Sequence, residues 1–188
     1  MSPEQALQRL REGNGRYVRD ELEHPDRDSE RRMAIVANQS PFAIIVGCSD
    51  SRVSPEILFD QGIGDLFVVR VAGNVIGPLE IDSVDYAALY LGAACVVVMG
   101  HERCGAVQAV VTGQTKDIES IAKLIEPAVG EARQSGPDDL LARAVKNNAV
   151  RMREYLLESR VIKKLVQEKK IIVRAAYYNL ATGAVEWL

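Results

Sequence analysis

The sequence contains little cysteine and histidine, with three Cys and two His among 188 residues. So few cysteines do not make a disulfide framework, and an odd number leaves at least one unpaired within the chain. Aromatic residues are also scarce, at 5% of the chain with a single Trp. The cysteines are therefore packing residues, metal ligands or nucleophiles, and their number alone does not decide among these roles.

An excess of charge of one sign is also absent, because 23 Lys and Arg stand against 26 Asp and Glu and give a net charge of −3. We therefore expect neither nucleic acid nor a membrane surface as a partner. No apolar run approaches the roughly 20 residues of a membrane span. Residues 1–30 are charged throughout and contain no apolar leader segment, so we expect a cytoplasmic protein with reduced thiols.

Apolar runs rich in β-branched residues predict the strands of a buried, mostly parallel sheet. They cover residues 42–47, 66–70, 95–100 and 170–177, and a turn then leads to an antiparallel edge strand at 184–187. Helical patterns lie between the runs, at 55–60, 79–91, 104–111, 117–130 and 138–160. This alternation predicts an α/β fold, in which helices flank a central sheet within a single domain.

We expect that domain to span residues 1–188, with an N-terminal helical arm over about 1–38. Ser2, Pro3 and Gln5 are typical of a helix start, and this helix is predicted to end near Glu21. A short helix is predicted over 31–37.

Two predicted strands are followed by residues with reactive or metal-binding side chains. Ligands in such folds bind beyond the carboxyl ends of strands. Cys48 follows the first run, and His101 and Cys104 follow the third. If these strands are neighbours, the three side chains converge as a Cys/His/Cys set that suits Zn²⁺ and leaves a fourth position open for water. Cys95 lies inside a strand and is interpreted as core, whereas His24 lies in a polar loop.

Asp50 and Arg52 lie beside Cys48, and two interpretations of them are open. They could form a surface ion pair worth about 0–1 kcal/mol. Alternatively, Arg52 holds Asp50 ionised and turned away from the metal, so that Asp50 orients the metal-bound hydroxide. We favour the second interpretation, in which release by Arg52 would let Asp50 become a conditional fourth ligand in a closed state.

The motif C-S-D-S-R at 48–52, followed by H-x-x-C-G at 101–105, resembles the β-class carbonic anhydrases. The similarity extends over nearly the whole chain, including 64–74 and 178–183. The resemblance implies reversible hydration of CO₂ to bicarbonate and a proton by a zinc-bound hydroxide. It also implies one zinc ion per chain and an Asp–Arg dyad; the ligands would be Cys48, His101 and Cys104, and the dyad Asp50 and Arg52.

The resemblance further implies a substrate pocket formed by Gln39, Phe67, Tyr86 and the backbone amide of Gly105. In that family the neighbouring subunit supplies part of the pocket, so we expect a homo-oligomer, either a dimer or a tetramer built as a dimer of dimers. Some bacterial members carry a bicarbonate-dependent off switch that needs a Trp where this chain has Ile45. This difference favours the plant-type active site, which is open and constitutively active.

Three other functions fit parts of the same pattern. A hydrolase of carbonyl sulfide or carbon disulfide could use the same zinc site. A zinc-stabilised interaction module would have four protein ligands and no activity. A redox protein would use Cys48 and Cys104 as a disulfide pair.

Overall fold

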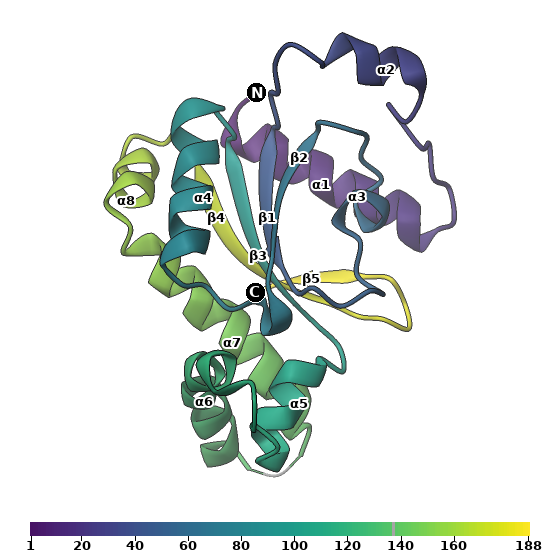
Figure 1. Cartoon of the computed structure of the whole chain (residues 1–188). Coiled ribbons are helices and arrows are strands. Elements are labelled where there is room, and N and C mark those ends of the chain that lie inside the picture. Colours follow the sequence, from purple (N-terminus) through teal and green to yellow (C-terminus); the bar gives the residue numbers. More distant parts are fainter. Residues whose placement is uncertain (137) are drawn as a thin grey trace.

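The computed structural model describes residues 1–136 and 138–188, and its centre is a five-stranded sheet (Figure 1). The strands are β1 (Ala43–Gly47), β2 (Leu66–Arg70), β3 (Cys95–His101), β4 (Ile172–Tyr178) and β5 (Val185–Trp187). Their spatial order is β2-β1-β3-β4-β5, with β1 to β4 parallel and β5 antiparallel to β4. The α/β fold predicted from the sequence is therefore confirmed, including its antiparallel edge strand.

Side chains of β1 and β3 alternate between two hydrophobic cores, one on each face of the sheet. Ile44 and Val96 belong to one core, whereas Ile45 and Val97 belong to the other. Because both faces are covered, these strands appear in the sequence as unbroken apolar runs.

The helices that contribute buried residues divide between these cores by their order in the chain (Figure 1). The core that contains Ile45 also includes buried residues of α1 (Pro3–Val18) and α3 (Pro55–Leu58). The core that contains Ile44 is built with α4 (Pro78–Tyr90), α5 (Gly105–Thr112), α6 (Glu119–Gln134), α7 (Leu140–Leu157) and α8 (Arg160–Gln167). A single 3₁₀ turn, η1 (Ala72–Asn74), follows β2.

The structure differs from the sequence-based elements mainly near the C-terminus. The helix predicted over 138–160 is present as α7, which ends at Leu157, and a further helix that the sequence did not predict, α8, begins directly after it with Ser159 as its N-cap. Its hydroxyl accepts hydrogen bonds from the amides of Val161 and Ile162, which is the standard role of an N-cap serine. In the arm, α1 ends at Val18 and α2 spans Ser29–Ala34, each a few residues from the expected bounds. The extent of the domain over 1–188 stays a prediction.

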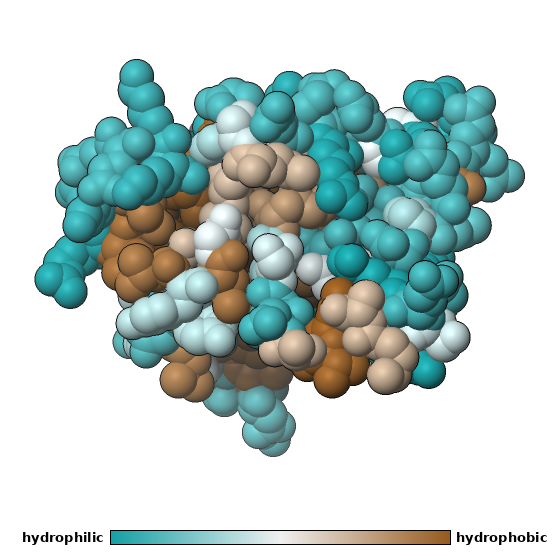
Figure 2. All heavy atoms as spheres, turned by 90° about the horizontal axis from the view of Figure 1, so that it is seen from above, coloured by the Kyte–Doolittle hydropathy of each residue, from teal (hydrophilic) through white to brown (hydrophobic). Residues whose placement is uncertain are grey.

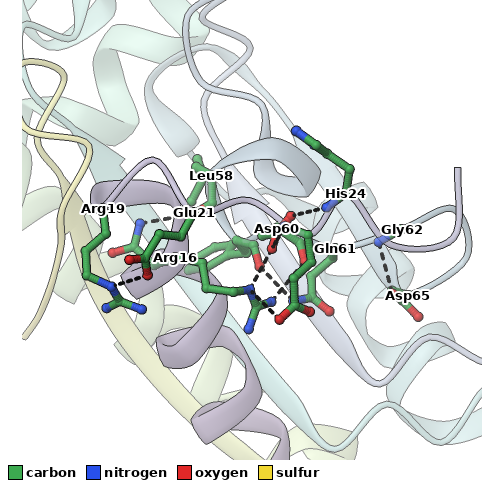
Figure 3. Close-up of polar contacts among 12 residues, drawn as sticks. Arg16, Arg19, Glu21, His24, Leu58, Asp60, Gln61, Gly62 and Asp65 are labelled. Atoms are coloured by element: carbon green, nitrogen blue, oxygen red, sulfur yellow. Dashed lines mark hydrogen bonds and ion pairs between the residues drawn. The ribbon is translucent and has the colours of Figure 1, made fainter.

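A buried carboxylate fastens the arm to the rest of the chain (Figure 3). Asp60, whose side chain is fully buried, accepts a hydrogen bond from Nε of Arg16 at 2.6 Å. It also accepts from the amides of Glu23 and His24, each at 3.0 Å. One side chain thus joins α1 and the loop after it to the residues that follow α3.

Among the helices of the described residues, none has the length and apolar character that a membrane crossing needs.

Replacing Asp60 by Asn should lower the free energy of unfolding by about 3 kcal/mol near neutral pH, because it leaves Arg16 without its buried partner. Burial raises the pKa of Asp60, but Arg16 and the two amides lower it more, so the net shift is downward. The stabilisation is therefore complete above the unfolded-state pKa of about 4 and is lost as pH falls through the folded-state value.

Urea unfolding at pH 7 and pH 3 measures this difference. The matched control is Glu21→Gln, because the pair of Glu21 with Arg19 is solvent-exposed (Figure 3). The control should change stability by less than about 1 kcal/mol. An Asp60→Asn effect of equal size at both pH values would contradict the role of the ionised carboxylate.

Candidate metal centre

The candidate site lies where β1 and β3 end. These strands are parallel neighbours, and Gly47 of β1 pairs with Met99 of β3. Cys48 directly follows β1 and His101 is the last residue of β3, so the pairing brings both to one edge of the sheet. The chain then turns at Arg103, whose φ is 53°, and Cys104 becomes the N-cap of α5. The neighbouring strands on which the predicted site depended are therefore present.

Cys48, His101 and Cys104 form a buried group whose ligand atoms all lie within 4.8 Å of one another. Nδ1 of His101 lies 2.9 Å from the carbonyl oxygen of Glu102, an acceptor, so Nδ1 carries the proton and donates it. Nε2 is then an unprotonated acceptor, and it is buried without a hydrogen-bond partner among the described residues. Two thiols and such an imidazole nitrogen are the donors that Zn²⁺ prefers, so these residues fit a zinc ion.

A hydrogen bond joins the thiols of Cys48 and Cys104. That bond, from Cys104, is the main cause that lowers the pKa of Cys48 to about 4; the amide of Gly73 lowers it further, whereas burial opposes the shift. The same bond, together with burial, raises the pKa of Cys104. The Gly73 amide lies 3.2 Å from Sγ of Cys48. The first proton is therefore lost easily, which favours binding of a cation.

Asp50 and Arg52 form a two-point ion pair beside this group. Nε of Arg52 donates to Oδ1 of Asp50 at 2.9 Å, and Nη2 donates to Oδ2 at 2.8 Å. These hydrogen bonds hold the pKa of Asp50 well below its usual range, although partial burial opposes them. Oδ2 lies 3.8 Å from Nε2 of His101. An ionised carboxylate therefore stands next to the candidate ligands while Arg52 engages both of its oxygens.

Arg70 braces the loop that carries Cys48 and Asp50. Its Nε donates to the carbonyl oxygen of Cys48 at 2.8 Å, and its Nη2 donates to that of Asp50 at 2.6 Å. Arg70 ends β2 directly beside Gly47, so it reaches the loop from the neighbouring strand. Sequence reasoning missed this role, and that of the Gly73 amide, although both residues lie in the segment 64–74. Their signal was position alone, at the end of an apolar run for Arg70 and just after it for Gly73.

The four predicted pocket residues do not lie together in one chain. Gly105 begins α5 next to Cys104 and is close to the metal group. Phe67 pairs with Ile44, four residues before Cys48, which corresponds to about 13 Å along the strand. Its ring lies 6.4 Å from that of Tyr86 on α4. Gln39 is exposed and precedes the start of β1, at the opposite end of the strand.

The remaining cysteine and histidine lie away from the site. Cys95 is fully buried at the start of β3 and belongs to the core on the other face of the sheet. Burial raises its pKa to about 12, as expected of a packing residue. His24 lies in the loop held by Asp60, where its backbone amide makes the contact (Figure 3).

The family model and the relatives reported below carry the same description. The sequence model of the family described as carbonic anhydrase matches residues 43–185. A carbonic anhydrase of Mycolicibacterium smegmatis is 34% identical over 194 residues, which cover 98% of this chain and 93% of the relative.

Two solved structures share the fold. The Coccomyxa β-carbonic anhydrase, solved in complex with acetazolamide, is 26% identical with a TM-score of 0.73 and covers 86% of this chain and 78% of its own. A tetrameric β-carbonic anhydrase of the ascomycete Sordaria macrospora is 22% identical with the same TM-score of 0.73, covering 84% and 85% of the two chains.

Replacing Cys48 by Ala should abolish stable zinc binding, because two remaining ligands hold the ion too weakly. Metal analysis after dialysis should find about one zinc ion per wild-type chain and nearly none in the variant. Cys95→Ala is the matched control, since it removes an equally buried thiol on the other face and should retain the metal. Equal zinc content in the two variants would refute the assignment.

Proposed function

Because the chain belongs to the β-class carbonic anhydrases, enzymes that hydrate CO₂, we propose that it interconverts CO₂ and bicarbonate at the edge formed by Cys48, His101 and Cys104, with one zinc ion per chain. The observation that carries this proposal is the buried, unpartnered Nε2 of His101 beside two thiols and one ionised carboxylate. Burying an imidazole nitrogen without a partner costs free energy, and a metal ion removes that cost.

Zinc bound there supplies Lewis-acid chemistry that makes water nucleophilic near neutral pH. The protein's part is to direct that nucleophile. Oδ2 of Asp50 faces the candidate ligand His101 and can accept a hydrogen bond there. The Arg52 guanidinium keeps the Asp50 carboxylate ionised. This carboxylate can therefore accept a hydrogen bond from the reacting water and fix the direction of the lone pair. The same two hydrogen bonds restrain Asp50 from becoming the fourth ligand.

The substrate pocket is proposed to form between two copies of the chain. Phe67 lies about 13 Å along the strand from the level of Cys48, Tyr86 lies beside Phe67 on α4, and Gln39 precedes β1. We therefore infer that none of them acts in its own subunit. A second copy can bring them over the metal site, so that the partner subunit's Phe67 and the partner subunit's Tyr86 line an apolar pocket for CO₂. Gly105, in the first turn of α5, offers an amide that the helix itself does not use.

Exposure of apolar surface supports such an assembly. β2 is an edge strand whose five residues all retain some exposure, although four of them are hydrophobic. Tyr86 and Tyr90 are 46% and 73% exposed on α4, with their rings 5.6 Å apart. Seen from above, the molecule presents hydrophobic patches between hydrophilic surroundings (Figure 2). A homodimer, alone or paired into a tetramer, would cover such surface.

No observation on the described residues favours carbonyl sulfide or carbon disulfide as the substrate, so CO₂ is the one proposed.

The three cysteines are free thiols. A reducing compartment such as the cytoplasm suits them, because the two thiols of the site would otherwise be open to oxidation. The direct test is stopped-flow CO₂ hydration on a sample of measured zinc content; zinc-loaded protein without activity would refute the proposed function.

Replacing Asp50 by Asn should leave zinc content unchanged but reduce kcat by about 10²-fold or more, because the amide no longer provides the ionised acceptor. Stopped-flow hydration and metal analysis on the same preparation measure both quantities. Glu126→Gln, an exposed carboxylate on α6, is the control and should retain full activity. A variant of Asp50 with wild-type kcat would refute the orienting role.

Mixing two inactive variants tests the shared pocket. Asp50→Asn and Phe67→Ala chains, unfolded together and refolded, should regain about a quarter of wild-type activity, since half of the dimers are mixed and each has one intact site. If Phe67 acts within its own chain, the mixture stays as inactive as the two variants refolded separately.

A further inference from the structure

We propose that Asn148 is a positioning residue of the metal centre, which acts through Gly73 to aim a backbone hydrogen bond at the Cys48 sulfur. The inference rests on the proposed zinc site and adds to it a residue on α7 that is distant in sequence from both metal-binding motifs. By sequence pattern alone, Asn148 falls within an apolar, core-facing stripe of that helix.

Asn148 is a polar residue on an otherwise apolar helix face. It is fully buried, one residue before Ala149 and in line with Val145 and Met152, which also belong to the buried face of α7. The helix packs directly on β3, because a Cβ on Gly100 would lie 2.7 Å from Cγ1 of Val145. Burying an amide at such a position costs free energy unless its hydrogen bonds are satisfied. Its specific partner therefore matters.

That partner is the backbone of the segment that contacts Cys48. Nδ2 of Asn148 donates to the carbonyl oxygen of Gly73 at 2.8 Å. The amide of Gly73 in turn donates to Sγ of Cys48 at 3.2 Å. One helical turn further along α7, Sδ of Met152 accepts from the amide of Ile76 at 3.2 Å. The helix therefore holds residues 73–76 at two points.

This segment needs an external anchor because of its backbone. Gly73 has a φ of 72° and Asn74 a φ of 45°, so two successive residues are left-handed. A side chain at position 73 would be strained by this φ, and its Cβ would lie 2.7 Å from Cδ1 of Ile125, which would have to shift. Glycine is thus favoured, yet glycine has the widest choice of backbone conformations. Fixing its carbonyl oxygen from α7 restricts that choice and keeps the amide directed at the sulfur.

The hydrogen bond from Asn148 to Gly73 is expected to affect metal affinity as well as stability. A hydrogen bond to a ligating sulfur fixes the direction of its lone pairs, and loss of such outer contacts weakens metal binding by about 10–100-fold. Asn148→Leu keeps the branched shape and the number of heavy side-chain atoms and removes the donor. We therefore expect its zinc Kd to rise about tenfold or more. The cobalt(II)-substituted protein should also show an altered sulfur-to-cobalt charge-transfer band.

The experiment measures zinc Kd by chelator competition, the cobalt spectrum, and hydrogen exchange of the Gly73 amide by NMR. Asn14→Ala is the matched control: Asn14 is also buried and also donates to backbone carbonyls, those of Leu58 and Gly183, away from the site. The control should lower stability while keeping zinc Kd within about twofold of wild type. Asn148→Ala repeats the test if the Leu variant does not fold.

The outcomes separate the two proposals. Weaker zinc binding, a changed cobalt band and faster Gly73 exchange in the Asn148 variants alone support the positioning role. Unchanged Kd and spectrum, or equal losses in the Asn14 control, overturn it. A Gly73 amide that exchanges freely in zinc-loaded wild-type protein also overturns it, whether or not any variant folds. Failure of wild-type protein to bind zinc refutes the proposed function instead.

Discussion

The candidate metal centre depends on the parallel pairing of β1 with β3. Cys48 and His101 are 53 positions apart in the chain, and they meet because Gly47 lies beside Met99 at the carboxyl edge of the sheet. A slip of that register by one residue would turn every side chain of the slipped strand to the other face and separate the ligands. Hydrophobic cores on both faces prevent such a slip, since every residue of both strands is buried. The chemistry at the edge is therefore fixed by packing in the middle.

Most of this arrangement could be predicted because it follows from local patterns. Buried strands leave apolar runs, and parallel strands place their ends at one edge, so the sequence groups Cys48, His101 and Cys104 once the two strands are taken as neighbours, and the family resemblance implies the same ligand set. The bracing by Arg70 and the Gly73 amide could not be predicted, because backbone hydrogen bonds across elements leave no periodic signal. The helix α8 was missed for another reason: it begins directly after α7, and the local signal for its start is a single capping residue, Ser159.

The candidate ligands and the Asp50–Arg52 pair differ in their burial. The candidate ligands are buried, where the low dielectric strengthens their attraction for a cation. Arg52 is half exposed, with 52% of its side chain accessible, whereas 16% of the Asp50 side chain is. The pair therefore contributes little to stability, which frees it for chemistry. Arg70 holds only carbonyl oxygens of this loop, so the backbone stays fixed even if the Asp50 side chain moves.

The proposed pocket places a different constraint on the opposite part of the molecule. Within one chain, the metal group lies at the carboxyl ends of the strands, and Phe67, Tyr86 and Gln39 lie toward their beginnings. If both sets are needed, the metal centre is a property of the single chain, whereas the substrate pocket is a property of the assembly. Selection for activity would then keep β2 free as an edge and keep aromatic side chains exposed on α4, although exposure of both invites unwanted association in a monomer. On this proposal, the exposed apolar surface follows from the division of the reaction between two copies.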